Sequence, residues 1–116
     1  PLLLRRGTIS RIDTTRAGGP PLCAIDAFPY VADRVQLQAG DLLCLFTDGV
    51  TEASDGSTMF GSKALQKALL KAEADTLAGI ATQLRDAVRH FEAGHPPADD
   101  LTLLLLRWNG PKTNAG

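Results

Sequence analysis

The sequence predicts an α+β fold, a layered structure of antiparallel strands with amphipathic helices on its outside. Two segments, residues 42–46 and 103–106, are apolar at consecutive positions. Because side chains alternate between the two faces of a strand, both faces of these strands must be covered. The segments follow one another as strands, two helices and a final strand, without the regular alternation of a doubly wound parallel sheet. We expect the helices to cover one face and a second sheet to cover the other.

The composition limits the classes of function. The chain has 116 residues, which suits one domain or a part of one. Its hydrophobic fraction of 44% argues against disorder. The 12 basic and 13 acidic residues nearly cancel, so the chain carries no field for holding nucleic acid. No apolar segment approaches the length of a membrane span and no signal peptide is visible, so we expect no membrane contact by this segment.

The first residues and the cysteines give two further expectations. The chain begins at Pro1 as though already inside a strand, so we expect it to be cut from a longer protein. Cys23 and Cys44 are too few for a disulfide framework, and Cys44 lies inside an apolar run. They predict reduced thiols in a cytoplasmic protein.

The first half of the chain is predicted to form strands. Residues 2–5 and 8–12 flank Arg6-Gly7 and predict a β-hairpin. A connection rich in Gly and Pro follows, within which residues 22–25 are expected to add a short strand. Residues 35–38 alternate apolar and polar, which predicts a half-exposed strand that forms a hairpin with residues 42–46.

The second half is predicted to form two helices and the final strand. After a loop at residues 54–61, Ser62 is expected to cap a helix that runs to about Ala72. Asp75 is expected to cap a longer helix, which Gly94 ends. The final strand covers residues 100–108, and the tail at 110–116 is expected to be disordered because it has nothing to bury. The apolar stripe of the longer helix contains Leu77, Ile80, Ala81, Leu84, Val88 and Phe91.

Carboxylates occur at the ends of the two apolar strands. Asp48 follows the strand at 42–46, and Asp99 and Asp100 precede the final strand. If these strands are antiparallel neighbours, the carboxylates gather at one edge of the sheet, where they repel one another unless a cation compensates. Clustered carboxylate oxygens suit Mg²⁺ or Mn²⁺. Asp99 and Asp100 point to opposite faces, so at most one of them shares a metal with Asp48.

Gly49 fits the same hypothesis, because a glycine permits a tight turn and leaves the neighbourhood of Asp48 open to a ligand. A simpler interpretation stays open at this point. Asp-Gly after a strand is a common turn, and Asp-Asp before a strand is also typical of a solvated turn. Composition alone favours the interpretation as two solvated turns. The position of both motifs at the ends of two central strands makes a metal site nearly as well supported.

Several motifs together resemble a known family. GDLLCLFTDGVTEA, then MFG, a helical stretch and ADDLTLLLLR occur in this order and at these spacings. The set resembles the C-terminal half of bacterial PPM-type serine/threonine phosphatases, and most closely their SpoIIE/RsbU-like branch, relatives of protein phosphatase 2C. The resemblance extends from about Pro1 to Trp108.

The resemblance implies a sandwich of two antiparallel sheets flanked by helices, with a binuclear Mn²⁺ or Mg²⁺ site at one end. Asp48 and Asp99 match metal-ligand positions of the family, where a water activated by the cations attacks phosphorus. Asp100 and Gly49 match supporting positions beside the ligands. Glu52, in the TEA element, is expected to shape the adjoining loop. The implied substrate is a phosphorylated regulatory protein, such as an anti-sigma-factor antagonist.

The departures from the family pattern concern the first half of the domain. The family's other metal ligands lie there, and nothing before residue 41 resembles them; Cys23 also stands where the family often has glycine. We therefore expect residues 1–109 to be the C-terminal portion of a phosphatase domain that is inactive alone. Uncovered strand faces would favour a homodimer.

The Asp-Gly and Asp-Asp motifs have three other interpretations, two of which need particular residues. A haloacid-dehalogenase-like phosphatase needs a nucleophilic Asp where this chain has Phe46. A receiver domain needs an acidic pair near its start and a late lysine, whereas here the pair comes late and Lys112 lies in the tail. The alternative that stays open is a degenerate phosphatase-like domain that binds a protein partner without catalysis.

Overall fold

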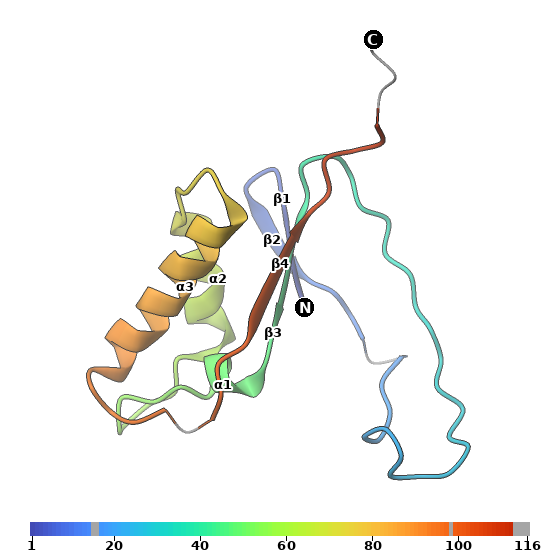
Figure 1. Cartoon of the computed structure of the whole chain (residues 1–116), viewed down its shortest axis with the longest axis horizontal. Coiled ribbons are helices and arrows are strands. Elements are labelled where there is room, and N and C mark those ends of the chain that lie inside the picture. Colours follow the sequence, from blue (N-terminus) through green and yellow to red (C-terminus); the bar gives the residue numbers. More distant parts are fainter. Residues whose placement is uncertain (15–16, 98, 113–116) are drawn as a thin grey trace.

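A four-stranded antiparallel sheet with helices on one face forms the body of the protein (Figure 1). A computed structural model describes residues 1–14, 17–97 and 99–112. The order of strands in the sheet is β2-β1-β3-β4. The elements are β1 (Leu2–Arg5), β2 (Thr8–Arg11), β3 (Leu42–Phe46), α1 (Asp48–Thr51), α2 (Gly61–Lys71), α3 (Leu77–Glu92) and β4 (Leu103–Arg107).

The pairing of the strands confirms two expectations from the sequence. β1 and β2 form the hairpin, and its turn residues Arg6 and Gly7 both have positive φ, 50° and 77°. Such a turn matches the twist of the strands it joins. β3 and β4 are antiparallel neighbours, with Phe46 opposite Leu103. The end of β3 therefore lies beside the start of β4.

The hydrophobic core lies between the sheet and the helices α2 and α3. The predicted stripe of α3 faces this core, since Ile80, Leu84 and Val88 are buried. Cys44 of β3 is buried in the same core, in agreement with its position inside an apolar run of the sequence. The buried hydrophobic cluster contains Leu2, Leu42, Cys44, Val50, Ala53, Leu65, Leu69, Ile80, Leu84 and Val88.

Both predicted helix caps are wrong by one or two residues. The N-cap of α2 is Phe60, which makes no side-chain cap, and the hydroxyl of Ser62 accepts a hydrogen bond from Gln66 instead, at 3.3 Å. The N-cap of α3 is Thr76, whose hydroxyl accepts from the Gly79 N–H at 3.0 Å. Asp75 lies one residue before Thr76 and is therefore one residue farther from the Gly79 N–H. The predicted end of α3 is confirmed, because Gly94 follows its last turn with φ 89°.

Two predicted strands, at residues 22–25 and 35–38, are absent. Leu22 is 80% exposed, and Cys23 has φ 67°, which no strand adopts. The described residues of the connection from β2 to β3, 12–14 and 17–41, run along the side of the sheet opposite the helices (Figure 1). Among them, the backbone bonds to the chain beyond β4 only after the predicted strand at 35–38, with the Gly40 N–H donating to the Trp108 carbonyl at 2.6 Å and the Trp108 N–H donating to the Asp41 carbonyl at 3.0 Å. The alternation at 35–38 therefore leads to no hairpin, and β3 pairs with β1 instead.

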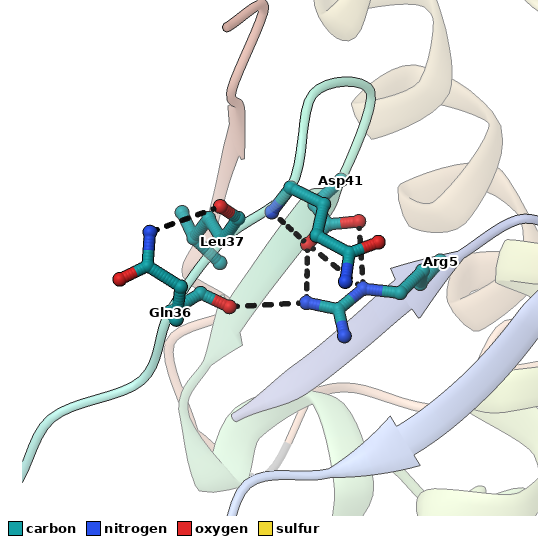
Figure 2. Close-up of polar contacts among 5 residues, drawn as sticks. Arg5, Gln36, Leu37 and Asp41 are labelled. Atoms are coloured by element: carbon teal, nitrogen blue, oxygen red, sulfur yellow. Dashed lines mark hydrogen bonds and ion pairs between the residues drawn. The ribbon is translucent and has the colours of Figure 1, made fainter.

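An ion pair fixes the end of this connection to β1 (Figure 2). The Asp41 side chain is only 2% exposed, and its carboxylate accepts from Nε of Arg5 at 3.1 Å and from Nη2 at 2.7 Å. It also accepts from the Gln38 N–H at 2.7 Å, and Arg5 Nη2 donates to the Gln36 carbonyl at 3.1 Å. The Arg5 guanidinium lowers the pKa of Asp41 below its usual range.

The second face of the sheet is open. Leu43 pairs with Leu106, and Leu45 with Leu104, so these four leucines share the face opposite the core. Leu104 is 58% exposed and Leu106 is 45% exposed. The described residues contain no second sheet to cover them. The radius of gyration is 16.6 Å, whereas a compact domain of this length has about 13 Å. The chain has the shape of a partial domain.

The Arg5–Asp41 pair makes stability depend on acid. A carboxyl group with a lowered pKa in the folded state contributes stability that is present above its unfolded value, about 4. That contribution is lost as the pH falls through the lower folded value. We expect Asp41→Asn to lower the urea midpoint at pH 7 and to have little effect at pH 2. Asp86→Asn, at a well exposed position, is the control; equal losses from Asp41→Asn at both pH values would contradict the prediction.

The open leucine face should make the isolated chain self-associate. We expect the double variant Leu104→Glu/Leu106→Glu to weaken association by at least about tenfold, since it removes apolar area and adds like charges. Sedimentation equilibrium measures the change. Leu70→Glu is the matched control, because Leu70 is 51% exposed on a helix and does not belong to this face. The same loss in both variants would show that the sheet face is not the contact.

Candidate functional site

The carboxylates predicted as metal ligands lie where β3 and β4 meet. β3 ends at Phe46, and Asp48 opens α1, a single turn of helix that replaces the simple turn expected after the strand. Val50 of this turn is fully buried in the core, so it fixes α1 to the body of the protein. Asp48 stays exposed at its start. An apolar strand thus ends in an anchored turn that presents a carboxylate to solvent.

Gly49 is required by its contact with the segment before β4. A Cβ atom on Gly49 would overlap the carbonyl oxygen of Asp100 and lie 2.6 Å from its carbonyl carbon. It would also lie 3.1 Å from the Leu101 nitrogen. No side chain fits there, so only glycine lets the two segments approach this closely. This contact places the Asp48 turn directly against the Asp99-Asp100 pair.

Thr47 holds the same two segments together through hydrogen bonds. Its backbone N–H donates to the Thr102 carbonyl at 3.2 Å. Its hydroxyl accepts from the Thr102 N–H at 3.2 Å and donates to the Asp100 carbonyl at 3.3 Å. Thr47 is not among the residues predicted from the sequence. A hydroxyl residue between an apolar strand and a candidate ligand is the signal that could have indicated it.

The three aspartates share one edge of the sheet and are all exposed. Asp99 accepts a hydrogen bond from the Asp100 N–H at 2.7 Å. Asp100 contributes its backbone carbonyl to the contacts with Thr47 and Gly49, and its supporting role in a metal site stays a prediction. The roles of Asp48 and Asp99 as metal ligands and in catalysis stay predictions.

The side chains at this edge are of the type that binds a divalent cation, but they are too few to hold one alone. Exposed carboxylate oxygens at one edge are the hard ligands that Mg²⁺ and Mn²⁺ prefer. Within residues 1–14, 17–97 and 99–112, however, no three His, Cys, Asp or Glu side chains gather in a group that could hold a metal. Asp48 and Asp99 could therefore hold one side of an ion whose other ligands come from elsewhere.

Glu52 and the loop after it border the site. The Glu52 N–H donates to the Asp48 carbonyl at 2.8 Å and ends α1, while its carboxylate is exposed. In the loop that follows, Asp55 accepts from the Ser57 and Thr58 N–H groups at 2.9 and 2.8 Å, and these bonds lower the pKa of Asp55. The backbone of Glu52 therefore closes α1 before this loop, and the expected role of Glu52 in shaping the loop stays a prediction.

Comparison with known proteins identifies the family. The family model described as stage II sporulation protein E (SpoIIE) matches residues 1–109. The chain belongs to the SpoIIE family. This confirms the resemblance inferred from the motifs around Asp48 and Asp99. The comparison with curated proteins finds no match.

Two solved structures show the fold of this SpoIIE-family chain. Both are of the phosphatase domain of the cell fate determinant SpoIIE from Bacillus subtilis, one of them presoaked with Mn. Each has a TM-score of 0.68 and 22% sequence identity, and each match covers 97% of this chain. The matches cover 48% and 50% of the solved chains, so this chain spans about half their length. The predicted fold class, a partial domain of this architecture, is confirmed.

No helix among the described residues of this SpoIIE-family chain is long and apolar enough to cross a membrane. The longest, α3, has 16 residues, and its exposed positions carry charged side chains such as Arg85 and Asp86. Its apolar stripe instead faces the protein core.

The hydroxyl of Thr47 should stabilise the edge that carries the aspartates. Thr47→Val keeps the shape of the side chain and removes both hydroxyl hydrogen bonds, so we expect a loss of about 1 kcal/mol in the free energy of unfolding. Thr47→Ser retains the hydroxyl and should lose less. Urea denaturation gives the free energies, and faster amide exchange at Thr102 should accompany the loss in Thr47→Val alone. Identical exchange in the two variants would rule out this role.

Proposed function

We propose that this SpoIIE-family chain is the C-terminal half of a metal-dependent phosphatase that hydrolyses phosphoserine or phosphothreonine on a regulatory protein. The observation that carries the proposal is the close contact of Gly49 with Asp100. Together with the Thr47 hydrogen bonds, it brings Asp48 and the Asp99-Asp100 pair to one exposed edge. Membership of the SpoIIE family supports the same function.

Each residue of the edge has a separate role in this proposal. Asp48 and Asp99 would hold Mn²⁺ or Mg²⁺ at the end of the sheet, as part of a binuclear site. Gly49 lets the two ligand segments approach, and Asp100 holds them through its carbonyl group. When bound, the cations supply an acidified water for attack on phosphorus and neutralise charge on the phosphoryl oxygens.

The chain supplies only part of such a site. Small divalent cations of this kind need further carboxylates or substrate phosphates beyond two aspartates. Since the chain spans about half of the solved domains, we infer that the remaining ligands belong to the other half. The open leucine face supports this division, because the other half would cover it. We therefore expect the isolated chain to be inactive.

The substrate and location are inferred from the exposed edge and the thiols. Asp48, Asp99 and Asp100 lie at the surface, where a phosphate carried by a folded protein can reach them. We infer a phosphorylated regulatory protein similar to an anti-sigma-factor antagonist. Cys23 and Cys44 are free thiols, which favours the reducing cytoplasm. The net charge of −1 argues against nucleic acid as a partner.

A second candidate is a degenerate phosphatase-like domain that binds a protein without catalysis. The absence of a group of three metal-ligating side chains in the described part of the chain favours it. The two candidates differ in what the longer protein does with Mn²⁺: a phosphatase turns over a phosphoprotein, whereas a binding module does not.

The function is tested in the longer protein that contains this segment, with a phosphoserine peptide and Mn²⁺. We expect Asp48→Asn or Asp99→Asn to lower kcat/KM and Mn²⁺ affinity by at least about 100-fold. Substitution of residues that only hydrogen-bond to metal ligands already lowers metal affinity or activity by about 10- to 100-fold. Asp100→Asn should have a smaller effect, since Asp100 acts through its backbone. Calorimetry with Mn²⁺ separates binding from turnover.

The isolated chain is the control for the division of the domain. It should show no turnover with Mn²⁺. Metal-dependent turnover by the isolated chain, abolished by Asp48→Ala, would show that the chain is a complete enzyme. Equal losses of Mn²⁺ affinity in Asp99→Asn and Asp100→Asn would refute the ligand assignment.

A further inference from the structure

The outer side of the helix pair α2–α3 carries a groove that the proposed activity does not use. The two helices lie side by side on the sheet (Figure 1). Between them is a hollow of about 350 Å³. Its lining consists of Phe60, Ala64, Lys67, Ala68, Lys71, Ala72, Gln83 and Ala87.

The floor of the groove is made of small apolar side chains. Ala64, Ala68 and Ala72 recur every four residues, so they form one row along α2, and Ala87 lies opposite on α3. Phe60 closes one end, where its ring packs edge-on against Phe91 with centroids 5.4 Å apart. A row of alanines leaves room for another backbone to approach α2 closely. The shape therefore suits a helix laid along the groove.

A column of lysines lies along the rim on α2. Lys63, Lys67 and Lys71 are also spaced four residues apart and are all exposed. No acidic residue occurs anywhere in α2. Like charges at this spacing repel one another and destabilise a helix. Within the described residues, none of the three lysines forms an ion pair. The groove thus combines an apolar floor with an uncompensated positive edge, on a chain whose net charge is −1.

We propose that the α2–α3 groove docks an acidic amphipathic helix of a protein partner. Apolar side chains of that helix cover the alanine floor, and its carboxylates lie along Lys63, Lys67 and Lys71. Charge complementarity selects this occupant over a second copy, whose α2 would bring a like column of lysines. The apolar floor selects it over nucleic acid, which would contact the lysines alone. The docking site is independent of the phosphatase activity, since neither Asp48 nor Asp99 lines it.

The probe for this site is a synthetic helical peptide with leucines at i, i+3, i+4 and i+7 and glutamates beside them. Fluorescence anisotropy measures its binding to the full chain. We expect Lys67→Glu/Lys71→Glu to weaken binding by at least about tenfold, since it turns two attractions into repulsions. Lys67→Gln/Lys71→Gln should give a smaller loss. Circular dichroism of each variant establishes that the helices remain folded.

Two control variants locate the binding. Arg34→Glu/Lys112→Glu changes the net charge equally but lies outside the groove, and Leu104→Glu/Leu106→Glu alters the open sheet face. Both should bind the peptide as the wild type does. Ala64→Tyr, which fills the groove without changing charge, should weaken binding. The same peptide with lysines in place of glutamates should not bind.

Three outcomes would overturn the proposal. The first is no binding of the acidic peptide. The second is an equal loss in a control variant, which would mean general charge attraction or capture by the sheet face. The third is lysine-dependent cosedimentation with phosphatidylglycerol vesicles in the absence of peptide binding, which would make the lysine column a membrane contact.

Discussion

The contact between Gly49 and the Asp100 carbonyl group is the constraint on which the arrangement of this protein depends. Pairing of β3 with β4 brings the ends of the two strands together, but it leaves the turn after β3 free to point in several directions. The missing side chain of Gly49 and the buried Val50 remove that freedom. With α1 pressed against Asp100, the carboxylate-bearing turn has a single place. A substituted glycine would separate two segments that are about fifty residues apart in the sequence.

The sequence predicted the elements that bury apolar side chains. The spacing of apolar residues fits only one secondary structure in each of these elements, which are β3, β4, the first hairpin and α3. It failed where the pattern needed a neighbour that the chain does not provide. Residues 35–38 alternate like a strand, yet they form none in the structure, and Leu22 lies in an exposed turn. The Gln36 carbonyl accepts from Arg5 and the Gln38 N–H donates to Asp41 instead. Both contacts depend on the Arg5–Asp41 pair, which spans 36 positions and which no local pattern reveals.

The candidate site shows the same division. Asp48, Gly49, Asp99 and Asp100 could be selected from the sequence because strand ends and residue chemistry pointed to them. Thr47 has a weaker signal, its position between an apolar strand and a candidate ligand, and its role depends on the register that sets it against Thr102. The caps of α2 and α3 were misplaced for a related reason. Backbone geometry decides the cap: the N-cap of α2 is Phe60, whose side chain has no capping oxygen, and that of α3 is Thr76, one residue after Asp75. The remaining metal ligands of the proposed site could not be predicted, because the proposal assigns them to the other half of the domain.

The sequence separation of the paired strands has a consequence for how the chain folds. α2 and α3 are close in sequence, and so are β1 and β2, so their contacts close short loops and are expected to form early. Pairing of β3 with β4 closes a long loop, because α1, α2 and α3 lie between the two strands in the sequence. Loop closure of this length raises the entropic barrier more than the final stability. We therefore expect the edge with the aspartates to form late, because Asp48 and Asp99 stay apart until β3 and β4 pair.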